Sequence, residues 1–325
     1  MRLLRRTPAL LLANGISASI QGQFMFVVPW MMLARGSTPT EAALAAGLVF
    51  APMLVVSVPA GIVSDRSEPA RLMLVMLAVG IGACALYPAA VLAGSDWFGL
   101  VLLAALVTGT VRAFVEGAAL REAGNTATAP WLLRRQTIRT TLNQAAIFAS
   151  PFVGLLAYRA GGVTAVMLLV CLLHVAAGAL ALQAARLPVP RSLHRPSALA
   201  GMASFLGNRR LQWIGVAALV WNVFAGAALA IMPAVLREHV GLDEVEASVA
   251  FVVGGVAVVV LTLPVVALLQ RRLGTGTAFL LVVGYLVGVA LTAGLIGIMG
   301  FGALLALIAL GLGATAVEFR RPLVT

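Results

Sequence analysis

Long apolar runs, separated by short segments that contain Arg, Pro, Gly or acidic residues, constrain the fold of this 325-residue chain more than any other feature. A helix rises about 1.5 Å per residue, so about 20 apolar residues cross the roughly 30 Å hydrocarbon core of a bilayer. Ten runs approach that length, at about 8–33, 42–64, 72–94, 97–118, 140–159, 163–185, 212–235, 246–269, 276–297 and 299–318. Lipid cannot pair backbone groups, and the alternating pattern of a membrane barrel is absent, so each run is predicted to be a spanning helix.

The composition excludes a water-soluble globule, because 62% of the residues are hydrophobic and only 10% are charged. The two cysteines, Cys84 and Cys171, lie inside apolar runs without motif spacing, so we interpret them as small core residues. The sequence contains no nucleophile–base arrangement, metal-ligand spacing or phosphate loop. We therefore expect neither an enzyme nor a bound metal or cofactor.

All 22 basic residues are arginines, and their distribution predicts an orientation. If the N-terminus lies in the cytoplasm, 19 of them fall on the cytoplasmic side, and only Arg35, Arg159 and Arg237 fall on the other side. This asymmetry follows the positive-inside rule and favours a multi-pass protein of the cell (inner) membrane. The five arginines between Arg186 and Arg210 suit a linker near anionic lipid headgroups, so we do not expect nucleic-acid binding.

The chain also contains an internal repeat. A shift of about 205 positions places Thr38-Pro-Thr-Glu41 on Asp243-Glu-Val-Glu246, and each is a capping box that opens a helix. Two copies of one bundle predict three parts: a six-helix N-terminal bundle at 1–186, a cytoplasmic linker at 187–210 and an incomplete four-helix bundle at 211–325. A second copy of six would need two more helices, so we expect either a truncation or another chain that completes it.

The segment Gly61-Ile-Val-Ser-Asp65-Arg66, followed by Arg71, resembles the best-known motif of the major facilitator superfamily. The family usually has Gly and basic residues directly after the Asp-Arg pair, whereas residues 68–70 here are Glu-Pro-Ala. The resemblance implies an all-α membrane protein with a major facilitator-type helical bundle, here of about ten helices. It also implies that these four residues act as a latch at the inner gate. The alternative is that they only mark a cytoplasmic turn.

Arg112 resembles a second motif of that family, in which an Arg in the fourth helix is associated with proton coupling. Glu116 lies four residues later on the same helical face, where the two charges can pair in an apolar setting. We hypothesise that Glu116, partnered by Arg112, is the coupling carboxylate. The alternative is that both are solvated charges at headgroup level.

Ser150-Pro151-Phe-Val-Gly154 in the fifth helix resembles a reduced form of the Gly-Pro-x-x-Gly-Gly motif of antiport exporters. Proline removes a backbone donor and glycine removes bulk, which predicts a kinked, closely packed helix.

Polar residues in apolar runs are the remaining candidates. The first helix carries a polar set too dense for lipid exposure, and we expect it to face a central cavity where it could bind substrate. The candidate cavity residues are Asn14, Gln21, Gln23, Trp221 and Asn222.

These features predict a secondary transporter that works as a monomer in the membrane lipid and exports a small amphipathic or apolar molecule by alternating access. The drug and siderophore exporter branch of the family suggests this class, and proton antiport is the coupling that the resemblance implies. Two alternatives stay open: a truncated, non-transporting membrane protein, or an importer of a small polar nutrient.

Overall fold

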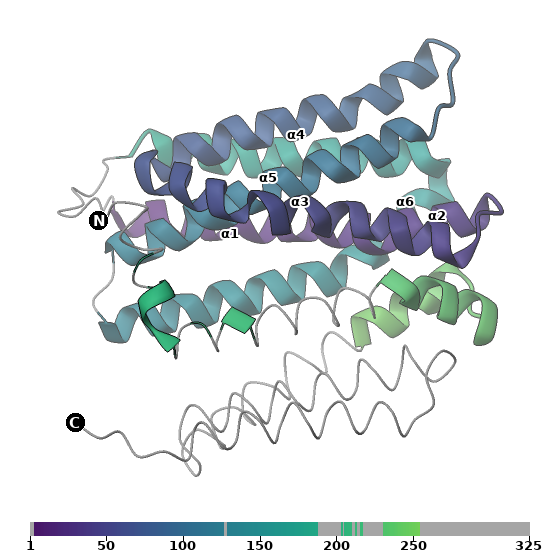
Figure 1. The fold of residues 1–325 in the computed structure, drawn as a ribbon. Coiled ribbons are helices and arrows are strands. Elements are labelled where there is room, and N and C mark those ends of the chain that lie inside the picture. The colour runs from purple at the N-terminus through teal and green to yellow at the C-terminus, as the bar shows by residue number, and fades with distance from the viewer. Residues whose placement is uncertain are drawn as a thin grey trace.

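The computed structural model describes residues 3–126, 129–187, 203, 205–209, 212, 215–216 and 230–253, and all regular elements among them are helices. The elements are α1 (Leu3–Gly22), the π-helical turn η1 (Gln23–Val27), α2 (Val28–Ala34), α3 (Pro39–Arg66), α4 (Pro69–Leu92), α5 (Gly99–Thr126), α6 (Ala129–Ala185) and the π-helical turn η2 (Val235–His239). α1, η1 and α2 together form the first spanning helix. Figure 1 shows that the long helices lie side by side along one axis.

Helix starts follow local side-chain chemistry. The Thr38 hydroxyl accepts from Glu41 N at 3.3 Å, and Glu41 Oε2 accepts from Thr38 N at 2.8 Å, which is the predicted capping box of α3. Asp243 and Glu246 make the same reciprocal pair, with Asp243 Oδ1 accepting from Glu246 N at 2.8 Å and Glu246 Oε2 accepting from Asp243 N at 3.0 Å. Both predicted boxes are therefore confirmed.

α6 consists of two arms, because Gly161 (φ −157°, ψ 26°) and Gly162 (φ 62°, ψ −153°) are not helical. The backbone of Gly162 lies in a region that residues with a Cβ avoid, so the Gly-Gly pair allows the chain to reverse. The first arm, 129–160, and the second arm, 163–185, run along the bundle in opposite directions (Figure 1). They correspond to the predicted fifth and sixth helices.

The first spanning helix lies at the centre of the bundle and packs mainly against α6, while α3 packs against α5, and α4 packs against α5 and α6. The approach of α3 and α5 depends on glycine. A Cβ at Gly109 would overlap the carbonyl group of Val49, and one at Gly117 would come within 2.6 Å of the Ser64 hydroxyl. Small residues at such contacts let spanning helices pack closely.

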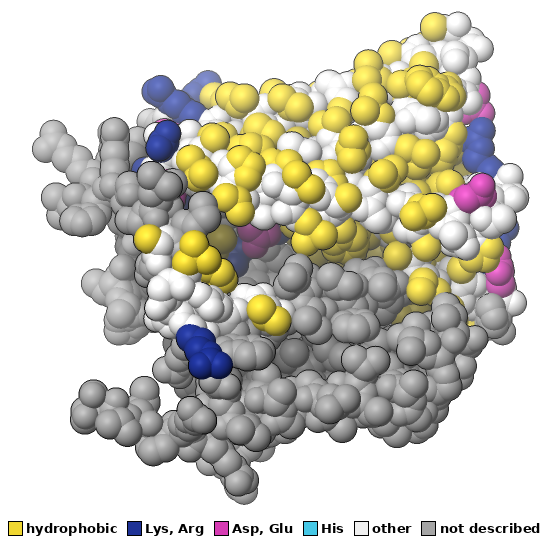
Figure 2. All heavy atoms as spheres, viewed as in Figure 1, with side chains coloured by type: hydrophobic (Ala, Val, Ile, Leu, Met, Phe, Trp, Pro, Cys, Tyr) yellow, Lys and Arg dark blue, Asp and Glu magenta, His cyan; other side chains and the backbone are white. Residues whose placement is uncertain are grey.

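α3 and α4 turn apolar side chains outward. Val55, Val58, Val75 and Val79 are about half or more exposed, which suits contact with lipid tails. Figure 2 shows apolar side chains covering one face of the bundle, with charged side chains concentrated toward its ends. Within the described residues, five helices are long and apolar enough to span a membrane, and the fifth, Ile138–Ala185, contains both α6 arms. The prediction of an all-α membrane bundle is confirmed.

The predicted helix at 246–269 begins within the described residues, which are helical over 244–253. The predicted helices at 276–297 and 299–318 lie outside the described residues, and so does most of the predicted linker.

Candidate functional site

A buried arginine on α5, Arg112, forms the centre of a polar network between α1, α5 and α6. Its Nε donates to Gln21 Oε1 at 3.1 Å, its Nη1 donates to Asn14 Oδ1 at 2.6 Å, and its Nη2 pairs with Glu116 Oε2 at 2.5 Å. The Arg112 side chain is 2% exposed, so the surrounding helices shield it from solvent. A charge inside the bundle requires such a set of partners.

Glu116 bridges two arginines on different helices. One carboxylate oxygen pairs with Arg112, as the spacing predicted, and the other pairs with Arg139 on the first arm of α6. Glu116 is 30% exposed, so this side of the network is partly open. Sequence reasoning assigned Arg139 only to the cytoplasmic charge count, because nothing in the local pattern pairs residues 23 positions apart on separate helices.

The predicted cavity residues of the first helix lie at helix–helix contacts. Asn14, Gln21 and Gln23 are all buried. Asn14 Nδ2 donates to Asn143 Oδ1 at 2.9 Å, and Gln23 Nε2 donates to Ser150 O at 2.8 Å. These side chains therefore connect α1 and η1 to α6 and, through Gln21, to α5. The other two candidates, Trp221 and Asn222, lie outside the described residues.

The Ser150-Pro151-Gly154 motif lies where the first arm of α6 meets the first spanning helix. Pro151 has no N–H to donate to Ile147 O, and the Ser150 hydroxyl donates to that carbonyl at 2.8 Å instead. A Cβ at Gly154 would overlap the Gln23 amide, and one at Gly22 would overlap Ser150. The serine that departs from the family motif thus restores a hydrogen bond that the proline removes.

The Gly61, Asp65, Arg66 and Arg71 motif lies at the end of α3 and the start of α4. Within the part of the chain that the structure describes, the side chains of Asp65, Arg66 and Arg71 make no hydrogen bond or ion pair. A Cβ at Gly61 would meet no described atom within 4 Å. The close contacts between α3 and α5 are at Gly109 and Gly117 on α5 instead.

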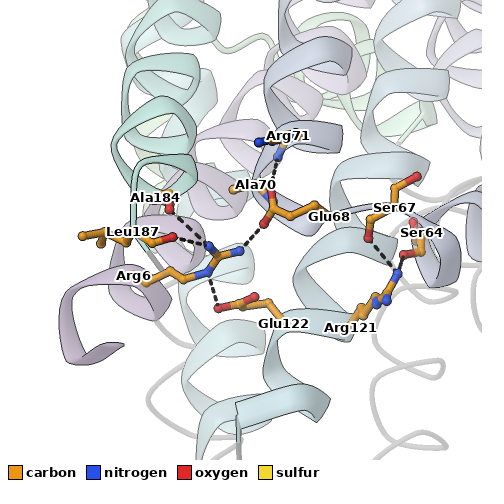
Figure 3. Close-up of polar contacts among 10 residues, drawn as sticks. All are labelled: Arg6, Ser64, Ser67, Glu68, Ala70, Arg71, Arg121, Glu122, Ala184 and Leu187. Atoms are coloured by element: carbon orange, nitrogen blue, oxygen red, sulfur yellow. Dashed lines mark hydrogen bonds and ion pairs between the residues drawn. The ribbon is translucent and has the colours of Figure 1, made fainter. Parts of the chain in front are cut away.

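Two neighbouring arginines hold this end of the bundle together (Figure 3). Arg6 is 0% exposed; its Nε donates to Glu122 at 3.0 Å, its Nη2 pairs with Glu68, and its Nη1 donates to Leu187 O at 3.1 Å. Glu68 also caps α4 by accepting from two backbone N–H groups. Arg121 Nη1 donates to Ser64 O and Ser67 O, at the end of α3.

Another ion pair lies at the end of the bundle opposite to Arg6. Arg35 pairs with Asp96 at 2.7 Å, and the Tyr87 hydroxyl donates to the other Asp96 oxygen at 2.6 Å. The Tyr87 hydrogen bond and the Arg35 guanidinium lower the pKa of the Asp96 carboxyl below its ordinary value of 3.8. These contacts join the loop after α2 to the loop after α4.

The two cysteines are free and lie in the packed bundle, as we interpreted them. Among the described residues, no group of three or more His, Cys, Asp and Glu side chains is placed to hold a metal ion.

A bundle of apolar helices with a charged network on its inward faces defines a polytopic membrane protein of the transporter class. The sequence model of the Major Facilitator Superfamily matches residues 10–320, so the chain belongs to this family. The protein is therefore a multi-pass membrane transporter with a small-molecule substrate, and not a typical enzyme.

Solved structures support the same fold. The crystal structure of a mutant of the nucleoside transporter NupG is similar with a TM-score of 0.60 and 12% identity, covering 97% of this chain and 84% of that one. A bacterial homologue of the iron transporter ferroportin in its inward-facing state has a TM-score of 0.54 and 19% identity, covering 99% of this chain and 85% of that one. At these identities the likeness concerns the fold alone. The search of curated protein sequences found no match.

Proposed function

We propose that this protein is a secondary active transporter that exports a small amphipathic or apolar molecule by alternating access and proton antiport. The observation that carries the proposal is Glu116, a partly exposed carboxylate held between Arg112 and Arg139 on two different helices. Binding a proton there changes the charge balance of a helix–helix contact.

The geometry suggests how proton binding and helix movement are linked. Protonation removes the negative charge between two guanidinium groups, so Arg112 and Arg139 then repel each other. The contact between α5 and the first arm of α6 weakens as a result. Arg112 keeps its hydrogen bonds to Gln21 and Asn14, so the change is directed toward α6.

The exporter direction and the substrate class rest on other features. The reduced Ser150-Pro151-Gly154 motif supports export, because it resembles the motif of antiport exporters. It lies where α6 packs tightly on the first spanning helix at Gly22 and Gln23. Buried side chains around this contact are mostly apolar, which favours an amphipathic or apolar solute.

The proposal also covers the gate, the orientation in the membrane and the division of the chain into two bundles. We assign a gating role to the motif Gly61, Asp65, Arg66 and Arg71 at the junction of α3 and α4, which lies at the same end of the bundle as Arg6. The N-terminus faces the cytoplasm of an inner membrane, and the monomer contains an N-terminal bundle at 1–186, a linker at 187–210 and a C-terminal bundle from 211.

Inverted membrane vesicles with an acidic lumen provide the test, with a panel of small aromatic and alkyl compounds of each charge. An exporter accumulates its substrates in these vesicles. Glu116→Gln should abolish gradient-driven accumulation, since an amide cannot bind and release the coupling proton.

The matched control is Glu41→Gln, an exposed carboxylate whose capping box also accepts Gln, and it should leave accumulation unchanged. Full accumulation by Glu116→Gln would exclude the coupling role. Accumulation only in right-side-out vesicles would show import, and transport of none of the compounds would contradict the proposed solute class.

A further inference from the structure

A cluster of aromatic rings joins the first spanning helix to the segment 230–253. We call it the aromatic cluster and define it as Phe26, Trp30, Phe148 and Phe251. The ring centroids of Phe26 and Phe251 are 3.9 Å apart, and those of Phe148 and Phe251 are 6.2 Å apart. Phe26 stacks on Trp30 at 6.2 Å. The cluster thus brings together rings from the first spanning helix, the first arm of α6 and the later half of the chain.

A cation lies at one end of this cluster. The Arg237 guanidinium lies over the Trp30 ring, with Cζ 5.6 Å from the ring centroid, which is a cation–π contact. Arg237 makes no ion pair with any carboxylate of the described residues. Among those residues, the group that attracts its positive charge is the face of the Trp30 ring.

Two buried donors at this contact have no acceptor. Trp30 is 1% exposed, and neither its Nε1 nor Arg237 Nη1 has a hydrogen-bond partner within the described part of the chain. The two buried arginines contrast with the half-buried Arg237, because Arg6 and Arg112 each use Nε, Nη1 and Nη2 in hydrogen bonds or ion pairs. Buried donors are nearly always paired, so two unpaired donors on the residues of one cation–π contact call for a missing acceptor.

The backbone around these donors is also irregular. Arg237 belongs to the π-helical turn η2, and Trp30 follows the π-helical turn η1 by three residues. Single π-helical turns are frequent at functional sites.

We propose that Arg237 and Trp30 form the anion subsite of the transported molecule, which is an amphipathic organic anion: an apolar, planar group bearing a carboxylate or a similar oxyanion. The oxyanion accepts from Arg237 Nη1 and Trp30 Nε1, and the planar group packs against the aromatic cluster. This inference rests on the proposed function and narrows its substrate class.

The structure shows little free space beside the aromatic cluster. The cavity beside Phe26 and Phe251, lined also by Gly22, Met25, Ile147 and Pro151, has a volume of about 10 Å³, enough for no more than one water molecule. The ligand therefore enters when Phe251 moves away from Phe26, which is the separation of the two parts of the chain that alternating access requires.

The test measures binding of three probes of similar shape to the full-length protein in lipid nanodiscs: 2-naphthoate, its neutral amide 2-naphthamide, and the cation 2-naphthylmethylamine. The wild-type protein should bind naphthoate at least about tenfold more tightly than either analogue, which equals about 1.4 kcal/mol. Arg237→Gln should weaken naphthoate binding at least about tenfold and change naphthamide binding less than about twofold. Trp30→Phe, which keeps a ring and removes the N–H, should also weaken naphthoate selectively.

The matched control is Arg159→Gln, which removes an exposed arginine that the positive-inside distribution places on the same side of the membrane, and it should leave all three affinities unchanged. Equal wild-type affinity for the three probes would overturn the proposal without any variant. An equal loss of affinity for all three probes in Arg237→Gln would also overturn it, since that result would show only that the contact between Arg237 and Trp30 is structural.

These outcomes are separate from those of the transport experiment. Proton-driven export of neutral or cationic compounds without preference for naphthoate would refute the anion subsite and leave the exporter intact. Selective naphthoate binding without proton-driven export would support the subsite and refute the transport direction or coupling.

Discussion

Individual charged residues inside the bundle differ in how completely they are paired. Arg112 contacts acceptors on α1 and on its own helix α5, and Arg6 contacts acceptors on α5, near the end of α6 and just before α4. Among the described residues, the Arg237 guanidinium makes a cation–π contact with Trp30 and no ion pair. Leaving a buried donor unpaired costs about 1–3 kcal/mol. The paired donors of Arg6 and Arg112 therefore stabilise the bundle, whereas Arg237 Nη1, which has no partner among the described residues, is better explained by a ligand.

Asp96 gives a prediction about pH at the scale of one residue. Its pKa is lower in the folded protein than its ordinary value of 3.8, because Tyr87 and Arg35 favour the ionised form. A carboxyl whose pKa is lower in the folded than in the unfolded protein adds stability at pH values above its unfolded-state pKa. This added stability is lost as the pH falls through its folded-state pKa. Asp96→Asn should therefore lower the Tm near neutral pH, and the difference from wild type should shrink below pH 3.8.

Thermal unfolding of both proteins in the same detergent, measured across that pH range, checks the expectation. Tyr87→Phe keeps the Arg35 ion pair and should show a smaller effect with the same pH profile. A Tm difference that stays constant down to the lowest pH would contradict the assigned contacts.

At the scale of single helices, α6 contains a proline and several glycines, and neighbouring side chains compensate for the contacts that these residues cannot make. Pro151 breaks one backbone hydrogen bond, and Ser150 replaces its donor. Gly22 and Gly154 remove bulk where α6 and the first spanning helix meet, so Gln23 reaches the Ser150 carbonyl. The helix stays continuous at Pro151 and reverses only at Gly161–Gly162.

The reversal of α6 leads to a prediction for that element. Gly162→Ala places a Cβ on a backbone with φ of 62° and ψ of −153°, so it should destabilise the protein by about 1–3 kcal/mol. Unfolding in a denaturing detergent, followed by far-UV circular dichroism, measures the change.

Gly82→Ala is the matched control, because Gly82 is helical and a Cβ there meets no described atom within 4 Å. It should be neutral or stabilise by up to about 1 kcal/mol. Equal stability of the Gly162 and Gly82 variants would show that the turn tolerates other conformations.

Across the whole molecule, the Arg6 cluster joins elements that are far apart in the sequence. Arg6 connects the start of α1 to Glu68 before α4, Glu122 on α5 and the Ala184 and Leu187 carbonyls at the end of α6 (Figure 3). Arg6→Gln leaves carboxylates without their guanidinium and should destabilise the bundle by about 3 kcal/mol, measured by unfolding in mixed micelles.

A double variant separates this ion pairing from packing. Adding Glu122→Gln to Arg6→Gln should recover part of the lost stability, because it removes a buried charge that has lost a partner. Fully additive losses would mean that the Arg6–Glu122 pair contributes no coupling energy.

The sequence by itself determined the class of fold and the course of the first six helices. Apolar length, proline, glycine and capping residues act within a few positions, so they predicted α3 to α5, both arms of α6 and the capping boxes at Thr38 and Asp243. The Arg112–Glu116 pair was predictable for the same reason, since four residues on one helix share a face.

Only the tertiary structure decided the long-range contacts. Arg139 with Glu116, Arg6 with Glu122, and Arg237 with Trp30 each join residues on different helices, and the sequence signals for those arginines indicated only membrane orientation. Hydrogen bonds and ion pairs act over about 3 Å, so which side chains meet depends on how the helices rotate and pack, which no local pattern records. The hydrogen bonds of the first-helix amides to α5 and α6 likewise depend on packing, whereas the sequence predicted only that these side chains face inward.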